Sequence, residues 1–475
     1  MGKPVSNRSY NNAMGRRAFL CGGALATGAA LGLLAGCGQD AASESKDGDM
    51  PSTDAETRPD GAAPELTVLN EVVYPEAVGS ADYEKRQQVA DDNPLTDEFR
   101  SGLGLFADDV ACYGIGQSDA ENGPANLCLS PAGLYLALAM LAQGAGGNTQ
   151  AQLLDALGAS DAAALAEQCG NLMRVLCSYT TPDDDPAASV VELATSLWVR
   201  SDTPVETPFL ETATDSFYAE VFEAGAPGAV VERAMGTWVA DHTGSTLKPQ
   251  FKLDDSWLMS LMATVWFKDG WQDPFNPNDT ANGTFHTAKG DVTCDFMTQV
   301  RECTAVVTDA YSVAALPLGT GSSVTFLLPA EGTDPRALLA RATGNGMIFD
   351  LSGDDAAMAR VTYRVPRLSF DADGSVVEML KAMGITDVFE DGADLSGLLK
   401  TSAAVSAVDQ GTHFSMDEVG VEASSYTVVG IVATGMPPED LEDVDFTLDR
   451  PFAFRLTAPD GTVLFVGIVG DPTQK

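Results

Sequence analysis

The first half of the globular region shows a helical spacing of apolar residues. Thr96 can cap a helix in which four apolar side chains recur at intervals of three or four, namely Phe99, Leu103, Phe106 and Val110. A Ser-Pro pair at Ser130 begins a second helix, and its sequence PAGLYLALAML is so apolar that it requires a place in the core. Residues after the glycines at 144–147 predict a further helix that starts at Asn148 or Thr149.

Strand patterns dominate the rest of the chain. SVVELATSLWVR (189–200) and SWLMSLMATVWFKDGW (256–271) are apolar at both alternating sets of positions, as in the middle of a sheet covered on both faces. Shorter strand patterns follow at VTFLLPA, ARVTYRVPRLSFDA, FAFRLT and VLFVGIV, while SVVEMLKAMGI returns to helical spacing. Helices that dominate early and strands that dominate late predict an α+β fold.

The N-terminus has the pattern of an export signal. Arg16 and Arg17 precede an apolar stretch of about fifteen residues that ends in Leu-Ala-Gly before Cys37. This segment, residues 1–36, resembles a bacterial twin-arginine signal that ends in a lipobox, which implies cleavage before Cys37 and diacylglycerol on its thiol. We therefore expect an exported protein anchored to the outer face of the membrane or cell surface, or released from it. The alternative is an ordinary secretory signal followed by a chance cysteine.

The next segment, residues 37–90, is polar and acidic and predicts a flexible tether before a globular domain at 91–475. Four of the 27 basic residues precede Cys37, which leaves 23 against 68 acidic residues and a formal charge of −45. Nucleic acids and anionic membrane surfaces are therefore unfavourable partners, and membrane attachment is expected through the lipid alone.

Residues that could support catalysis or bind a metal are scarce. The chain contains three His and no HExxH, Gly-x-Ser-x-Gly or phosphate-binding glycine motif, so we expect neither an enzyme nor a bound cofactor. The six cysteines after Cys37 match no paired CxxC zinc pattern, so we expect no metal site. Cys294 and Cys303 could form a disulfide in an exported protein, and buried free thiols are the alternative.

One segment near the C-terminus, MDEVGVEASSYTVVGIVATGMPPED (416–440), combines the composition of a strand with the boundaries of a loop. It contains no Lys or Arg and changes from small polar residues to Val, Ile and Thr. An exposed strand-forming segment is an aggregation hazard unless the protein uses it.

Four sequence blocks, taken in order, resemble the serpin family. They are NLCLSPAGLYLALAMLAQGAGGNTQAQLL, ATVWFKDGWQDPF, VPRLSFDADGSVVEMLKAMGITDVFEDGADLSGL and RPFAFRLTAPDGTVLFVGIVGDPTQ. The resemblance runs from about Leu95 to Gln474. It implies a large five-stranded mixed sheet, two smaller sheets, eight or nine helices and an exposed reactive-centre loop.

The loop implied by this resemblance runs from about Glu418 to Pro438. The sequence Asp-Glu-Val-Gly-Val-Glu-Ala resembles the family hinge, and the hinge residues are Glu418, Gly420, Val421, Glu422, Ala423, Ser424 and Ser425. The family cleaves sixteen residues beyond the hinge Glu, which implies a reactive bond between Thr434 and Gly435. A second, independent alignment gives the same bond. Met-Pro-Pro-Glu, which begins at Met436, resembles the family segment that begins two residues after the cleaved bond.

Alternation along this segment suits insertion as a strand. One set of positions is small or β-branched throughout: Val421, Ala423, Ser425, Thr427 and Val429. If this set faces the core, the charge of Glu422 and the ring of Tyr426 stay outside, and no buried charge arises.

The resemblance also implies a region where the large sheet opens. The matching residues are Asn126, Ser130, Pro131, Gln410 and Trp271. Gly133, Ala263 and Gln410 depart from the family, which usually has Ser, Asn and His at these three positions. Trp271 has the alternative of an ordinary core residue.

These residues predict a monomeric inhibitor of serine proteases that acts by suicide cleavage of its loop. The absence of Lys and Arg from Val419 to Asp449 excludes trypsin-like targets, and the small residues around Thr434 favour elastase-like or subtilisin-like proteases. One alternative is a non-inhibitory binding or structural surface lipoprotein of the same fold, whose loop is only a substrate. A solute-binding lipoprotein would share the anchor but not the hinge.

Overall fold

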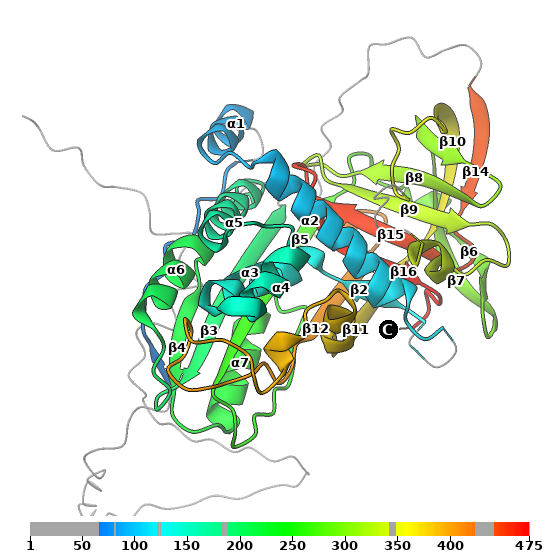
Figure 1. Cartoon of the computed structure of the whole chain (residues 1–475). Helices are drawn as coiled ribbons and strands as arrows, with labels where there is room; N and C mark the ends of the chain where they lie inside the picture. Colours follow the sequence, from blue (N-terminus) through cyan, green and yellow to red (C-terminus); the bar gives the residue numbers. More distant parts are fainter. Residues whose placement is uncertain are drawn as a thin grey trace, which may run out of the picture. The chain divides into compact units, whose positions relative to one another are not determined.

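The computed structural model describes residues 66–79, 82–120, 123, 125–182, 189–341, 348–422 and 441–474. All of them belong to one unit, residues 65–475. Figure 1 shows this unit as sheets with helices packed against them.

The first sheet is mixed and contains seven strands in the order β1-β4-β3-β5-β13-β12-β11. β3 and β4 are parallel, and the other neighbours are antiparallel. The predicted five-stranded sheet is therefore present, with β1 added at one edge and β13 added in the middle. The bounds are β1 Leu66–Val68, β4 Glu220–Ala224, β3 Val190–Arg200, β5 Met259–Gly270, β13 Gly420–Val421, β12 Asp409–Met416 and β11 Leu368–Ser375.

The second sheet has the order β14-β10-β7-β8-β9-β15-β16-β2, and β6 pairs with β7. Two smaller sheets were expected, but the 18-residue strand β7 pairs with β6 and β10 and then with β8, and so joins them into one. The bounds are β2 Leu127–Leu129, β6 Ala281–Thr287, β7 Gly290–Val307, β8 Tyr311–Pro317, β9 Ser323–Pro329, β10 Ala356–Pro366, β14 Glu442–Thr447, β15 Phe452–Thr457 and β16 Val463–Val469.

Nine α-helices lie in the described part of the chain. They are α1 Tyr83–Asp92, α2 Asp97–Asp109, α3 Pro131–Gly144, α4 Gly147–Ala156, α5 Ala162–Cys177, α6 Thr207–Phe217, α7 Ala229–Asp241, α8 Pro335–Leu339 and α9 Val377–Ala382. The predicted helix starts are confirmed at Thr96, whose hydroxyl accepts from the Phe99 N–H, and at Ser130, which caps α3. A π-helical turn, Val110–Gly116, follows α2, and short 3-10 helices span Pro277–Asp279 and Asp387–Phe389.

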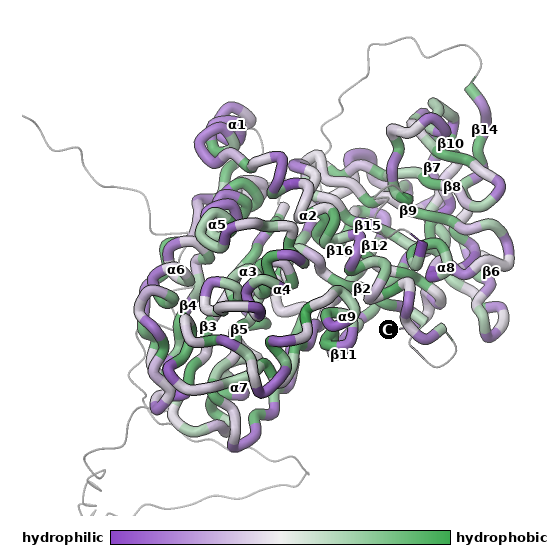
Figure 2. Tube along the Cα trace, viewed as in Figure 1, coloured by the Kyte–Doolittle hydropathy of each residue, from purple (hydrophilic) through white to green (hydrophobic). Residues whose placement is uncertain are grey.

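Both faces of β3 are covered, as its continuous apolar sequence predicts. Leu193 and Leu197 face the main core with α3 and α5, whereas Ala194 and Trp198 face a second apolar cluster beneath α7. Figure 2 shows the apolar character of α3 and of the strands beside it. The sheet is therefore enclosed between α7 and the other helices over this strand.

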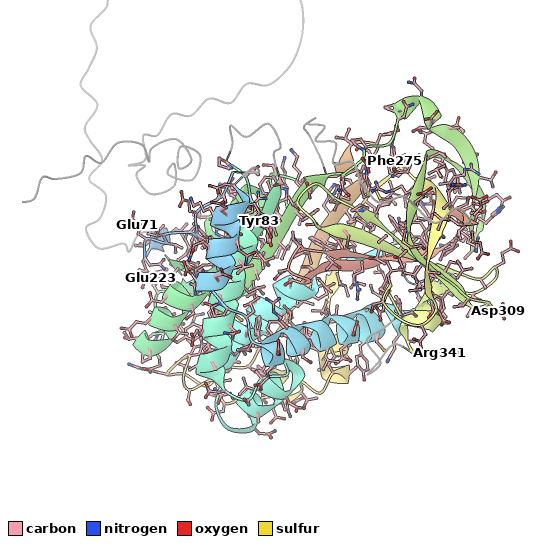
Figure 3. The ribbon with its side chains drawn as sticks, turned by 90° about the horizontal axis from the view of Figure 1, so that it is seen from above. Glu71, Tyr83, Glu223, Phe275, Asp309 and Arg341 are labelled. Carbon is pink, nitrogen blue, oxygen red and sulfur yellow. The ribbon has the colours of Figure 1, made fainter. Side chains whose placement is uncertain are left out.

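The folded unit includes residues that were expected in the tether. β1 pairs with β4, the Tyr74 hydroxyl donates to Glu220 Oε1 at 2.6 Å, and Val78 is 1% exposed. Figure 3 labels Glu71 in this segment and Glu223 on β4, and shows both at the same edge of the unit. Residues 66–68 thus extend the sheet, and Leu66 and Val68 add apolar surface to the cluster beneath α7.

The six described cysteines are free, including Cys294 and Cys303. Of the two alternatives for this pair, the structure has the free thiols. Among the described residues, no helix is both long enough and apolar enough to span a bilayer.

Candidate functional site

The hinge residues Gly420 and Val421 form β13 and lie between two strands of the large sheet. Val421 pairs with Met416 of β12 on one side and with Asp269 of β5 on the other. Its side chain is 2% exposed and belongs to the main core. Two hinge residues of the implied loop are therefore already part of the sheet, and Val421 points inward as the alternation predicts.

A tight turn at Asp417 reverses the chain between β12 and β13. The Asp417 carboxylate accepts hydrogen bonds from the N–H groups of Val419 and Gly420, at 2.8 and 3.2 Å. A side chain that bonds the backbone two residues ahead is a common way to stabilise such a turn. This turn directs the chain antiparallel to β12 and so into the sheet.

The Glu418 side chain is buried and anchors the hinge to neighbouring elements. Arg367, which precedes β11, donates to both carboxylate oxygens of Glu418, through Nη2 and, at 3.2 Å, through Nε; the Thr280 hydroxyl donates to Oε1 at 2.7 Å. Burial raises the pKa of Glu418, but these hydrogen bonds outweigh it and hold the pKa below its usual value. Glu418 is thus an ionised anchor that fixes the start of the hinge to Arg367 and Thr280.

Trp271 and Phe275 lie directly beside this anchor. The Trp271 indole N–H donates to the Asp417 carbonyl at 2.8 Å, and the backbone N–H of Phe275 donates to the Glu418 carbonyl at 2.9 Å. The two rings pack edge to face with centroids 5.8 Å apart, and Figure 3 labels Phe275. Trp271 therefore supports the turn directly, in addition to filling the core.

Beyond β13, a cleft of about 670 Å³ separates residues of β5 from residues of β12. Its lining includes Trp266 and Lys268 of β5, Ser415 of β12, and Gly244. Within the described residues, β5 and β12 are linked in the sheet only through β13. A cleft between two strands whose facing edges are unpaired in the described part of the chain is suited to receive another strand.

Glu422 is the last hinge residue that the structure describes, and the expectation that its charge stays outside concerns the inserted strand. The side chain is half-buried and lines the cleft, and this burial raises its pKa to about 7 despite nearby His413 and Lys268. Its φ of 47° is left-handed, which is unfavourable for a residue with a Cβ. The extended path of β13 therefore ends at Glu422.

The sheet-opening residues fall into separate groups. Gln410 on β12 bonds the backbone of Ser130 in both directions, since its Oε1 accepts from the N–H at 2.8 Å and its Nε2 donates to the carbonyl at 3.0 Å. The Ser130 hydroxyl donates to the Leu464 carbonyl, and Pro131 begins α3. Ser130, Pro131 and Gln410 thus meet, and they tie β12 to α3 and β16.

Asn126 and Trp271 lie apart from that contact. The Asn126 amide donates to the Asp471 carbonyl and accepts from the N–H groups of Gly470 and Asp471, so it fixes the C-terminal segment.

A Cβ at Gly133 would lie 3.3 Å from Val265 Cγ2 of β5. The same Cβ would lie 3.4 Å from Ser130 Oγ and 3.8 Å from Gln410 Nε2, so Gly133 borders the Ser130–Gln410 contact at the position where the resemblance implies a hydroxyl.

Several important residues were not identified from the sequence. Arg367 lies 51 positions before Glu418, and Thr280 lies 138 before it. No local pattern connects such distant residues, although Arg367 is the only cation in the block VPRLSFDADG.

Other predicted sites lie outside the described residues. These are the lipidation site Cys37, the reactive bond Thr434 and Gly435, and the remaining hinge positions Ala423, Ser424 and Ser425.

Comparison with known proteins gives consistent results. The family model described as serpin (serine protease inhibitor) matches residues 108–472. Alpha-1-antitrypsin 1-2 of Mus musculus is 27% identical over 398 residues, which cover 81% of this chain and 92% of the relative. Serpin-Z2A of Triticum aestivum is 27% identical over 378 residues, which cover 75% and 93%.

Solved structures share the fold. The thermophilic serpin tengpin in its native state aligns with a TM-score of 0.70 at 23% identity and covers 86% of this chain and 100% of that one. Human thyroxine-binding globulin complexed with thyroxine aligns with a TM-score of 0.66 at 20% identity, over 79% and 100%.

Proposed function

The chain belongs to the serpin family, and from this premise we propose that it inhibits serine proteases by suicide cleavage of its loop. Members of this family are mostly inhibitors rather than enzymes. The observation that carries the proposal is the position of Val421, buried between β5 and β12 at the head of an open cleft. An inhibitor of this kind needs a hinge that can enter the sheet, and here its first residues are in place.

The proposed reaction begins as an ordinary proteolysis. The serine hydroxyl of the protease attacks the carbonyl carbon of Thr434, the amine of Gly435 leaves, and the protease remains bound to Thr434 as an ester. Cleavage frees the segment from Val419 to Thr434, which spans about 50 Å when extended at roughly 3.3 Å per residue. This segment then adds to the sheet from β13 onward and carries the protease with it before the ester is hydrolysed.

The proposed targets are elastase-like or subtilisin-like serine proteases. A trypsin-like pocket needs a cation, and the chain has no Lys or Arg from Val419 to Asp449. Ile431, Val432, Ala433 and Thr434 suit a shallow pocket instead. A chymotrypsin-like protease would cut at Tyr426, too near the hinge to leave a strand long enough to insert.

Incubation with elastase, subtilisin, trypsin and chymotrypsin, followed by denaturing electrophoresis and mass spectrometry, tests this proposal. We expect a covalent complex with elastase or subtilisin and release of residues 435–475. A fragment that begins at Thr434 would shift the site by one residue and leave the target class unchanged. Cleavage without any complex would favour the non-inhibitory alternative, and a stable complex with trypsin would contradict the assigned targets.

We further propose that the protein acts as a monomer on the outer face of the membrane, anchored through Cys37. The acidic chain has no electrostatic affinity for a bilayer, so attachment depends on the lipid. Cys37→Ala should move the protein from the membrane fraction to the soluble fraction, whereas Cys112→Ala should not. Membrane association of the Cys37→Ala variant would contradict the anchor.

A further inference from the structure

A buried histidine joins α7 to the large sheet. His242 follows the last residue of α7 and is 6% exposed. Its Nδ1 lies 2.9 Å from Glu192 Oε1 on β3, and its Nε2 lies 3.4 Å from Glu220 Oε1 on β4. One imidazole therefore bridges carboxylates from two different strands.

The surroundings of His242 favour its charged form. Glu220 also accepts from the Tyr74 hydroxyl at 2.6 Å and from the Trp238 indole at 3.2 Å, which fixes its carboxylate. Burial lowers the pKa of His242, but hydrogen bonds to Glu192 and Glu220 outweigh it and raise the pKa above its usual value. A cation at the C-terminal end of a helix is favoured further by the helix dipole.

The turn after His242 borders the cleft. Gly244 lines the cleft together with Trp266 and Glu422. A Cβ at Gly244 would lie 2.3 Å from the Trp266 ring, so the turn is packed directly on β5. Glu192 pairs with this same Trp266 across β3 and β5. His242 thus holds the backbone that lies beside the edge where a strand would be added.

We propose that protonated His242 is a latch that keeps the end of α7 and the turn at 242–246 on the sheet, and that its deprotonation releases this segment. With a neutral imidazole, Glu192 and Glu220 lose the positive charge between them, and two half-buried carboxylates repel each other. The segment then separates more readily, and the cleft widens. The consequence for protease inhibition, faster loop entry at alkaline pH, rests on the proposed function.

The ionisable groups that surround this latch come from each packed element. They are Glu192 from β3, Glu220 from β4 and Tyr74 from the segment after β1, while Asp241 at the end of α7 is exposed. The pKa of Glu220 is held low by hydrogen bonds from His242 and Tyr74, although burial opposes this. The latch is therefore engaged in the window above the pKa of Glu220 and below that of His242.

Hydrogen exchange of the intact protein between pH 5.5 and 9, read by mass spectrometry and corrected for intrinsic rates, tests the latch without any protease. We expect peptides within 229–258 to lose protection as the pH rises through the pKa of His242. The size of the effect depends on how far the pKa of His242 with the segment docked lies above its pKa with the segment released. Each pH unit of that difference corresponds to about a tenfold change in protection between low and high pH. An NMR titration of the three histidines gives the pKa independently.

Two variants complete the test. His242→Gln should remove the pH dependence within 229–258, whereas His286→Gln, which changes an exposed His that also pairs with a carboxylate, should retain it. If His242→Gln does not fold, Glu192→Gln is the deciding variant, because it should lower the pH at which half of the protection within 229–258 is lost. Protection that is independent of pH in the natural protein, or a pH dependence that is unchanged in His242→Gln and Glu192→Gln, would overturn the latch. Absence of protease complexes would instead overturn the proposed function and leave this result standing.

Discussion

Val421 is the residue whose side chain most directly limits strand addition. It is 2% exposed within the core, so any replacement that carries a charge would have to bury that charge without a partner. We predict that Val421→Arg folds but is cleaved without trapping the protease, because the hinge can no longer enter the sheet. The measurement is the ratio of covalent complex to cleaved product on a denaturing gel.

Val421→Thr is the matched control, since Thr is the usual residue of the family here. It should retain complex formation within a few-fold of the natural protein. Complexes formed equally well by Val421→Arg would contradict the inward position of this side chain during inhibition.

The Glu418–Arg367 pair makes a pH-dependent contribution to stability. The pKa of Glu418 is lower in the folded chain than its usual value of 4.5, so the contribution is complete above that value and is lost as the pH falls through the folded pKa. We predict that Arg367→Met lowers the free energy of unfolding at pH 7 by about 1–3 kcal/mol, near the lower end because Arg367 is half-exposed. Urea denaturation should show that the difference in free energy of unfolding between Arg367→Met and the natural protein becomes smaller as the pH falls toward 3.

Arg360→Met provides a comparison at an exposed arginine. Arg360 lies 3.3 Å from Glu302 and 3.6 Å from Asp443, and its removal should cost less than about 0.5 kcal/mol. A loss at Arg367 that does not change with pH would show that the effect comes from packing instead.

At the scale of elements, the sequence patterns identified what depends on near neighbours. The caps at Thr96 and Ser130 and the two-faced strand β3 follow from local residue order, and the structure confirms them. The strand expected at β5 is present, but most of its residues are only half-buried. The order of strands and the hinge required the family resemblance. The N-terminal strand β1 was missed because three residues, Leu66–Val68, become a strand only by pairing with β4.

Contacts across the sequence explain what remained hidden in the site. Arg367, Thr280 and His242 reach Glu418 and Glu192 across 50 to 138 positions, and their own surroundings in sequence give no sign of it. The cleft likewise arises from the separation of β5 and β12, which no single segment encodes.

Gln410 and Ser130 join β12 to the start of α3, and we expect this contact to affect how easily the sheet opens. Gln410 satisfies both the N–H and the carbonyl of Ser130, and Gln410→Ala would leave two backbone groups without these partners. We predict a loss of about 1–3 kcal/mol in the free energy of unfolding and faster spontaneous loss of inhibition on warming. Denaturant titration and timed activity assays measure the two effects.

Asp409→Ala, at the exposed neighbouring position, should change neither quantity appreciably. Gln410→His should restore part of the stability, because an imidazole can replace one of the two hydrogen bonds. Normal stability and lifetime in Gln410→Ala would remove this contact from the opening mechanism.

At the scale of the whole molecule, the proposed function requires a native state that is not the most stable arrangement of the chain. Among the described residues, the edges of β5 and β12 have no common partner beyond β13. A strand that filled the cleft between them would add ladder hydrogen bonds on both sides and bury the small side chains at alternate positions. The uncut loop is held at both ends, at Glu418 and at β14, which opposes full entry. The native form is then kinetically trapped.

Cleavage after Thr434 releases one end, so we predict that a cut in the loop raises the thermal stability of the protein, whereas nicking an exposed loop normally lowers it or leaves it unchanged. An added strand of about a dozen residues should raise the Tm by well over 10 °C. Each 1 kcal/mol gained in the free energy of unfolding shifts the Tm of a chain this large by roughly 2 °C or less, so such a rise reflects a gain of several kcal/mol. Differential scanning calorimetry before and after limited elastase digestion measures the shift. Val421→Arg, digested in the same way, should show little gain, which separates strand insertion from the loss of a loop. An unchanged or lower Tm in the cleaved natural protein would favour a serpin whose loop is only a substrate.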